Sequence, residues 1–210
     1  MTRLIGIYGA GGCGRGIMPL ARSMPLARDA RLVFIDDGAG HGHINGQEVM
    51  SFDRFREEEA SEKHVALAVA GPAIRAAMAR KCDETGLQLL SVWAKDTIMM
   101  DDVEIDEGAL VSPYVTFTSN IKVGRCFHAN LYSYVEHDCV IGDYVTFAPG
   151  VRCNGNIRIG DRAYIGSGAV IRQNLTIGAD AVVGMGAVVT KDVPPGVTVV
   201  GNPAHILEKN

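Results

Sequence analysis

Apolar residues between Val103 and Lys191 recur with a period of six. The first and third positions of each block of six are almost all small or β-branched apolar residues, and this phase is kept through fifteen consecutive blocks without an insertion. Such a pattern is typical of a hexapeptide repeat. The third positions are Ile105, Val111, Phe117, Val123, Ala129, Val135, Ile141, Phe147, Cys153, Ile159, Ile165, Ile171, Ile177, Val183 and Val189.

Glycines add a second period of eighteen residues. Gly124, Gly142, Gly160 and Gly178 are spaced in this way, so three blocks of six make one coil. This predicts a column with three faces of short parallel strands, whose corners are tight turns that Gly, Asn and Asp tolerate at positive φ. Coils that pair their backbones stack at roughly 4.8 Å. The flat outer faces of such a column favour self-association.

The first ninety residues show a different alternation, of apolar runs with helical segments. A strand at Arg3–Tyr8 runs into a glycine-rich turn, and a helix is expected from about Arg15 to Met24. Backbone N–H groups at such a turn suit a phosphate. The next strand ends at Asp36 and Asp37, where a carboxylate can accept hydrogen bonds from a ribose or a base. The alternative is a glycine turn that serves only close packing in a parallel sheet.

Further strands are expected at 64–70 and 87–92, with a helix from about 73 to 85 between them. The N-terminal part is therefore a small βα sheet, too short for a complete two-half Rossmann fold. We place the join near Ala94, which gives domains 1–94 and 95–210. Pro194 and Pro195 end the repeat because proline cannot donate to a continuing strand ladder. A short strand at 198–200 and the turn 201–204 are expected to cap the column.

Composition excludes several classes of function. The net charge of −4 argues against nucleic acid or an anionic membrane surface as a partner. The chain has no run of eighteen apolar residues and no signal-peptide pattern at its start, so the cytoplasm is the expected compartment. Five scattered cysteines show no paired spacing, and Cys139 and Cys153 fall on inward positions of the repeat, where a thiol acts as a small hydrophobe. His41 and His43 lack a nearby third ligand, so a solvated loop is expected there.

The chemistry of the repeat depends on His137, which falls at the fifth place of its block, near a corner. Glu136 and Asp138 flank it, and either carboxylate can hydrogen-bond a ring nitrogen, fix the tautomer and raise the basicity of the other nitrogen. A lone histidine is also often structural. A metal site needs about three ligands, and the repeat supplies only His137 and the outward-facing His128, so no metal is expected.

A set of motifs spans essentially the whole chain: residues 9–14, 34–37, 135–143, 191–194 and 201–204, together with the glycines at eighteen-residue spacing. On these motifs the chain resembles the sugar O/N-acyltransferases of the left-handed β-helix superfamily. Within that superfamily it is similar to sialic acid O-acetyltransferases and to bacillosamine and perosamine N-acetyltransferases.

The resemblance implies a Rossmann-like α/β domain with a parallel sheet, followed by a left-handed parallel β-helix. It also implies a homotrimer that binds acetyl-CoA between neighbouring columns and holds a nucleotide-linked amino sugar partly by the N-terminal domain. The candidate catalytic residues are His137 as general base and Asp138 beside it. Contacts to the coenzyme are expected at Thr146, Gly155, Ser167 and Met185, with the Gly155 N–H facing the thioester oxygen. Contacts to the nucleotide sugar are expected at Gly11, Gly12, Cys13, Gly14, Asp36, Asp37 and Gly71.

Two positions depart from the family pattern. Thr146 stands where some relatives have a second histidine, and His205 stands where a basic residue often follows the Gly-Asn-Pro-Ala turn. The expected activity is acetyl-CoA-dependent N-acetylation of a nucleotide-linked 4-amino-deoxy sugar. O-acetylation of a sialic acid type of sugar stays open. A NAD-dependent oxidoreductase and a trimer that only binds a nucleotide sugar are further alternatives, of which the first leaves the repeat without a task.

Overall fold

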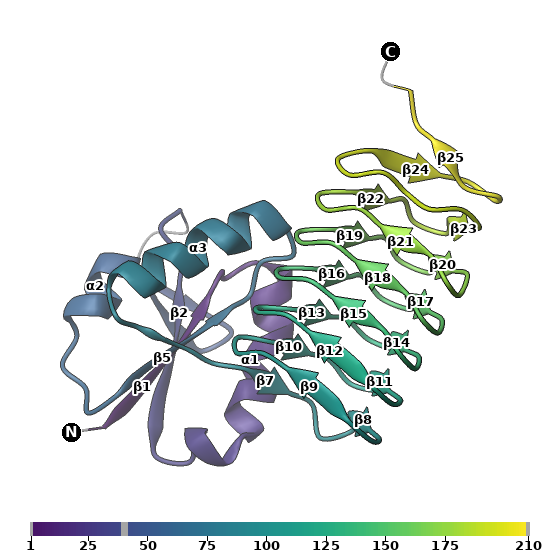
Figure 1. The fold of residues 1–210 in the computed structure, drawn as a ribbon. Coiled ribbons are helices and arrows are strands. Elements are labelled where there is room, and N and C mark those ends of the chain that lie inside the picture. Colours follow the sequence, from purple (N-terminus) through teal and green to yellow (C-terminus); the bar gives the residue numbers. More distant parts are fainter. Residues whose placement is uncertain (1, 39–41, 209–210) are drawn as a thin grey trace.

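The computed structural model describes residues 2–38 and 42–208. It shows an α/β part beside the lower coils of a column of stacked strands, with the C-terminus at the far end of the column (Figure 1). His41, part of the loop considered above, lies outside the described residues.

The N-terminal sheet has six strands in the order β3-β4-β2-β1-β5-β6. All neighbours are parallel except β3 and β4, which form a hairpin that the sequence pattern had not indicated. The predicted strands at 3–8, 31–35 and 64–70 are confirmed within a few residues. The strands are β1 (Arg3–Tyr8), β2 (Ala30–Ile35), β3 (Gly42–Ile44), β4 (Gln47–Met50), β5 (Lys63–Leu67) and β6 (Gln88–Leu89).

Helices cover both faces of this sheet. On one face, α1 (Gly12–Ser23) packs against Ile5 and Ile7 and also against the first strand of the column, β7 (Val92–Trp93), and the short 3-10 turn η1 (Pro25–Ala27) follows α1. On the other face, α2 (Phe52–Glu57) and α3 (Pro72–Glu84) pack against Leu4 and Tyr8. The predicted helix start at Arg15 was wrong by three residues. The helix already begins at Gly12, so the glycines form its first turn.

The column has three sheets, one for each face. The first face contains β7 (Val92–Trp93), β10 (Leu110–Val111), β13 (His128–Ala129), β16 (Thr146–Phe147), β19 (Tyr164–Ile165), β22 (Val182–Val183), β24 (Thr198–Val200) and β25 (His205–Ile206). The second contains β8 (Ile98–Met99), β11 (Thr116–Phe117), β14 (Tyr134–Val135), β17 (Arg152–Cys153), β20 (Val170–Ile171) and β23 (Val188–Val189). The third contains β9 (Val103–Ile105), β12 (Ile121–Val123), β15 (Val140–Ile141), β18 (Arg158–Ile159) and β21 (Thr176–Ile177).

The register of these sheets confirms three blocks of six per coil. Leu110 pairs with His128, and His128 pairs with Thr146, eighteen residues apart each time and always in parallel. The third-position side chains fill the inside of the column, as expected, and most are fully buried. At the C-terminal end β24 pairs with β22, with Val182 opposite Thr198, so the spacing falls to sixteen after the two prolines.

The glycines at eighteen-residue spacing do not supply the positive φ angles of the corners. Gly124, Gly142 and Gly160 do not have positive φ; a Cβ on Gly124 would lie 2.3 Å from Asp143 Oδ1 and 2.8 Å from the backbone of Gly142 in the next coil. They are needed for the close approach of successive coils. Other corner residues have the positive φ angles expected of Gly, Asn and Asp, among them Gly108, Gly150, Gly168, Gly186, Asn120 and Asp138. Tyr114 and Tyr132 also have positive φ, and their rings stack with centroids 5.1 Å apart.

Among the described residues, no helix has the length and apolar character needed to cross a bilayer.

Candidate active site

His137 lies at the corner that follows β14 and projects outward, with 56% of its side chain exposed. Its Nδ1 is 2.8 Å from Asp138 Oδ2. Asp138 has a φ of 61°, in the left-handed region that Asp adopts more readily than most residues. Of the two flanking carboxylates, Asp138 and not Glu136 is therefore the one that contacts the imidazole.

The charge of Asp138 tunes the imidazole. The hydrogen bond to Asp138 raises the pKa of His137 above its usual 6.5, with a smaller contribution from the charge of Glu136. The same hydrogen bond, and one from Asn120, lower the pKa of Asp138. An anionic Asp138 keeps the proton on Nδ1, which leaves Nε2 with its lone pair toward solvent. This is the arrangement that a general base needs.

Gly155 forms the floor beneath the imidazole, one coil further along the column. A Cβ on Gly155 would lie 2.5 Å from His137 Cε1 and 2.6 Å from Nε2, so no other residue fits without moving the ring. Beside them is a pocket of about 320 Å³ lined by Glu136, His137, Asn154, Gly155, Gln173 and Asn174. The structure thus brings His137, Asp138 and Gly155 together at one corner.

The Asp138→Asn variant is expected to shift the pH dependence of the reaction. An amide in place of the carboxylate removes the charge that raises the pKa of His137, so the acidic limb of kcat/KM against pH moves to lower pH. The maximal rate falls by about tenfold or more, a part of the ~10²–10⁴-fold that a general base supplies. A pH–rate profile checks this, and an acidic limb that moves to higher pH would contradict it.

The glycine loop lies at the other domain, where β1 turns into α1. Gly11 is the residue before the helix, and, apart from neighbouring backbone, no atom of the described residues lies within 4 Å of where a Cβ would be on Gly11 or Gly12. A Cβ on Gly14 would lie 1.7 Å from the carbonyl oxygen of Gly9, so the turn is tight at that point. The loop therefore presents the start of a twelve-residue helix to open space, which suits an anionic or polar ligand.

The two aspartates after β2 are used differently. Asp36 accepts hydrogen bonds from the Ala10 N–H at 2.9 Å and the Gly38 N–H at 3.0 Å, so it lies against the glycine loop. Asp37 accepts from the Phe52 N–H at 2.8 Å and the Tyr8 hydroxyl at 3.0 Å, on the face covered by α2 and α3. Only Asp36 is thus brought to the loop.

The ionisation of Asp37 reflects this environment. Partial burial acts to raise the pKa of Asp37, but the Phe52 N–H, the Tyr8 hydroxyl and the Lys81 ammonium outweigh burial and lower it.

Gly71 is the half-buried residue that precedes α3, where Pro72 takes the first helical position.

His128 is buried where the two parts of the chain meet, although its position in the repeat points outward. The residue is 1% exposed, its Nε2 is 3.9 Å from the Cys13 sulfur, and its Nδ1 has no hydrogen-bond partner among the residues that the structure describes. Burial first, and then the charge of Arg75, lower the pKa of His128 to about 3, so it is neutral. A pocket of about 360 Å³ lies here, lined by Gly12, Cys13, Gly16, Ile17, Leu20, Ser112, Pro113, His128, Asn130 and Leu131.

Arg75 joins the two parts through backbone carbonyls, and sequence reasoning missed it. The guanidinium is fully buried and donates to the Thr146 hydroxyl at 2.8 Å. Its carbonyl acceptors are those of Val69, Ala70, Cys126, Tyr144 and Val145. The sequence held a signal for the junction, although not for Arg75 itself. The outward positions Leu110, His128 and Thr146 carry no full charge, which indicates that this face of the column is covered.

Thr146, Ser167 and Met185 lie away from His137. Thr146 is fully buried, and its hydroxyl donates to the Ala70 carbonyl at 2.8 Å, so its expected role at the coenzyme stays a prediction without a contact to support it. Ser167 and Met185 are exposed and stacked at the corner between the first and second faces, Met185 at 82%. One chain therefore presents three separate groups: the His137 corner, the glycine loop with Asp36, and the Ser167–Met185 corner.

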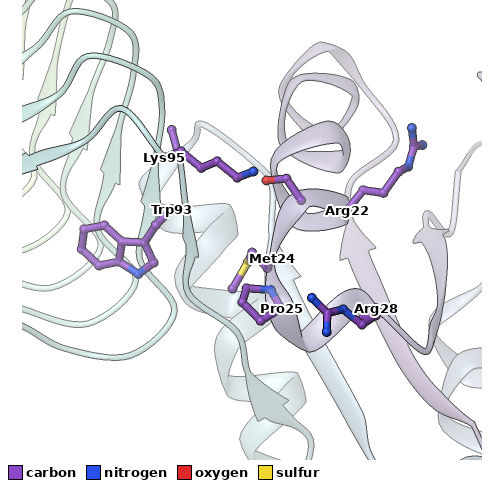
Figure 2. Close-up of a pocket in the computed structure, with 8 residues that line it drawn as sticks. Arg22, Met24, Pro25, Arg28, Trp93 and Lys95 are labelled. Carbon is purple, nitrogen blue, oxygen red and sulfur yellow. The ribbon is translucent and has the colours of Figure 1, made fainter.

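A larger hollow of about 720 Å³ lies at the opposite end of α1 from the glycine loop (Figure 2). Figure 2 shows Lys95 pointing toward the end of α1, Arg28 beside Pro25, and Arg22 pointing away from the hollow. None of the predicted site residues lines it. In the described part of the chain, no group of three or more His, Cys, Asp or Glu side chains is placed to hold a metal ion.

Comparison with known proteins shows the kind of protein to which this geometry belongs. Residues 156–191 match the model of the bacterial transferase hexapeptide (six repeats). The chain is 45% identical to the GDP-perosamine N-acetyltransferase of Escherichia coli O157:H7, over 99% of this chain and 97% of that protein. The chain belongs to the hexapeptide-repeat sugar acyltransferase family.

Two solved structures share the whole architecture. WeeI from Acinetobacter baumannii AYE is 52% identical, with 98% of this chain and all of that chain covered at a TM-score of 0.95. PerB from Caulobacter crescentus, in complex with CoA and GDP-perosamine, is 25% identical, with 97% of each chain covered at a TM-score of 0.86. The sequence-based assignment to this acyltransferase family is confirmed.

Proposed function

We propose that this acyltransferase transfers the acetyl group of acetyl-CoA to the amino group of GDP-perosamine or of a nucleotide-linked amino sugar close to it. The observation that carries the proposal is the 45% identity, over essentially the whole chain, to a GDP-perosamine N-acetyltransferase. The exposed pair of His137 and Asp138 supplies the base that such a reaction needs. No described feature favours the oxidoreductase alternative.

The residues of the His137 corner account for direct transfer. His137 Nε2 takes a proton from the sugar amine as the amine nitrogen attacks the thioester carbon, and Asp138 stabilises the imidazolium that forms. A C–N bond forms, the C–S bond breaks, and the proton held by His137 passes to the departing thiolate. The Gly155 N–H, beside the imidazole, stabilises the charge that develops on the carbonyl oxygen.

A homotrimer is proposed because one chain separates the groups that the reaction has to combine. The N-terminal domain covers the first face of the column, whereas His137 lies between the second and third faces. In a trimer of left-handed β-helices, the His137 corner of one subunit faces the glycine loop, or the Ser167–Met185 corner, of its neighbour. We also propose that the Rossmann-like domain 1–94 binds the nucleotide, with Gly11–Gly14 and Asp36 as contacts. The proposed compartment of the reaction is the cytoplasm.

The Gly16→Leu variant is expected to weaken binding of the amino sugar. Gly16 lines the pocket between α1 and the column, beside Gly12 and Cys13, and we place the amino sugar in this pocket. A Cβ at Gly16 meets none of the described atoms within 4 Å, so a leucine side chain can start here and take up part of the pocket, and leucine favours the helix over glycine. The KM for the nucleotide sugar should rise by about tenfold or more while that for acetyl-CoA stays unchanged. The matched control is Arg22→Leu, at the other end of the same helix. Equal KM values in Gly16→Leu and wild type would contradict the placement of the sugar.

The function itself is tested by a screen of acceptors. GDP-, UDP- and dTDP-linked 4-amino sugars are incubated with acetyl-CoA and the enzyme, and release of free thiol is followed. Turnover with GDP-perosamine above the other sugars supports the proposal. Turnover with sialic acid and with none of the amino sugars would replace it with O-acetylation.

A further inference from the structure

Asn120 contacts Asp138 from the coil below. The Asn120 Nδ2 donates to Asp138 Oδ1 at 3.1 Å, while Asp138 Oδ2 is the atom 2.8 Å from His137 Nδ1. Each oxygen of the carboxylate therefore has its own partner, an amide on one side and the imidazole on the other.

The backbone fixes this geometry. Asn120 and Asp138 occupy the same corner position eighteen residues apart and have φ angles of 56° and 61°. The Asn120 N–H donates to Asp101 O at 3.2 Å, and the Asp138 N–H donates to Ser119 O at 3.0 Å, so consecutive coils hold both residues in register. The side chain of Asp138 is nevertheless 52% exposed, and its carboxylate is free to rotate unless a second contact restrains it.

We propose that Asn120 is a positioning residue for acetyl transfer: it restrains the Asp138 carboxylate so that Asp138 holds the His137 ring in the productive tautomer and orientation. The inference rests on the proposed function. Asn120 itself does not touch the reacting atoms.

The same corner offers a matched contact without the histidine. Two coils beyond Asn120, Asn156 Nδ2 donates to Asn174 Oδ1 at 2.7 Å, with φ angles of 55° and 62°. The side-chain contact between coils therefore also occurs at this corner without a histidine. In the pair of Asn120 and Asp138, the carboxylate of Asp138 is also hydrogen-bonded to the imidazole, so this contact affects the orientation of His137 as well as the packing of the coils.

Two other groups act on the imidazole through their charge. The charge of Glu136 adds to the raised pKa of His137, and Cys139 contributes a smaller effect of the same sign. Both remain when Asn120 is replaced. A change in the pKa of His137 in an Asn120 variant therefore reports on Asp138.

The test compares Asn120→Gly with Asn156→Gly. Glycine accepts the positive φ at both positions, so each variant removes one side-chain contact without adding backbone strain. Asn120→Gly is expected to lower kcat by about threefold to tenfold, to leave both KM values unchanged, and to move the acidic limb of the pH–rate profile to lower pH. Both variants should lower Tm by a similar small amount, but Asn156→Gly should keep the wild-type pH profile.

Asn120→Asp gives a result of opposite sign. An added carboxylate cannot donate to an ionised Asp138, and its negative charge raises the pKa of His137, so the acidic limb moves to higher pH as kcat falls. The inference is overturned if Asn120→Gly keeps the wild-type profile, or if Asn156→Gly shows the same shift. An NMR titration of the His137 ring in the full chain gives the pKa shift without turnover, which separates failure of this inference from failure of the proposed function.

Discussion

Replacing His137 by asparagine is expected to abolish most of the acetyl transfer while leaving the fold intact. The ring is more than half exposed at a corner, so its loss removes little packing, but it removes the acceptor for the amine proton. General-base catalysis is worth ~10²–10⁴-fold in rate, and kcat should fall by about that factor with little change in either KM. Steady-state kinetics with acetyl-CoA and GDP-perosamine measure this.

Cys139 provides the control for His137. Its thiol is fully buried inside the column and donates to the Asn154 carbonyl at 3.2 Å, which places it where no substrate reaches. Cys139→Ala should keep near wild-type activity at a small cost in stability. A result in which Cys139→Ala is inactive and His137→Asn is active would replace direct transfer by a covalent acyl-enzyme.

Gly155→Ala is expected to lower activity by about a hundredfold or more without lowering Tm appreciably. The added methyl overlaps Cε1 and Nε2 of His137, so the ring has to swing away and its contact with Asp138 is lost. Because the ring is at the surface, it moves at little cost to folding. The loss approaches that of removing the base, ~10²–10⁴-fold.

Gly160→Ala provides the contrasting case. Its Cβ would lie 2.5 Å from the Ala179 backbone nitrogen, where no side chain can move aside, so this variant should lower Tm. The double variant Gly155→Ala, His137→Asn tests more sharply whether Gly155→Ala lowers activity by displacing the imidazole. If alanine at 155 acts through the ring, it adds no further loss to His137→Asn; an additive loss would show that Gly155 acts independently.

The repeat made the column predictable because almost every inward position from Val103 onward carries an apolar residue in the same phase. Its first coil was missed because Ser91 and Thr97 stand at first positions and Trp93 and Met99 at third positions, where small or β-branched apolar residues were sought. At Ser91 a hydrogen bond takes the place of an apolar contact, because the Ala109 N–H donates to the Ser91 hydroxyl at 3.1 Å.

The candidate site was predictable in part. His137 stands out by residue type, and Gly155 lies eighteen residues after it, so the period alone places the two together. The choice between Glu136 and Asp138 depends on the positive φ of Asp138, which a sequence with two flanking carboxylates does not reveal. The split use of Asp36 and Asp37 likewise follows from which face of the sheet each side chain takes.

The buried Arg75 has a consequence for how this enzyme family diversifies. Apart from the Thr146 hydroxyl, its acceptors are main-chain carbonyls, which every amino acid carries. The Arg75 hydrogen bonds therefore do not depend on which side chains stand at Cys126, Tyr144 and Val145, whereas they do require arginine at position 75. Acceptor preference can evolve in the N-terminal domain while one arginine keeps that domain at a fixed height on the column.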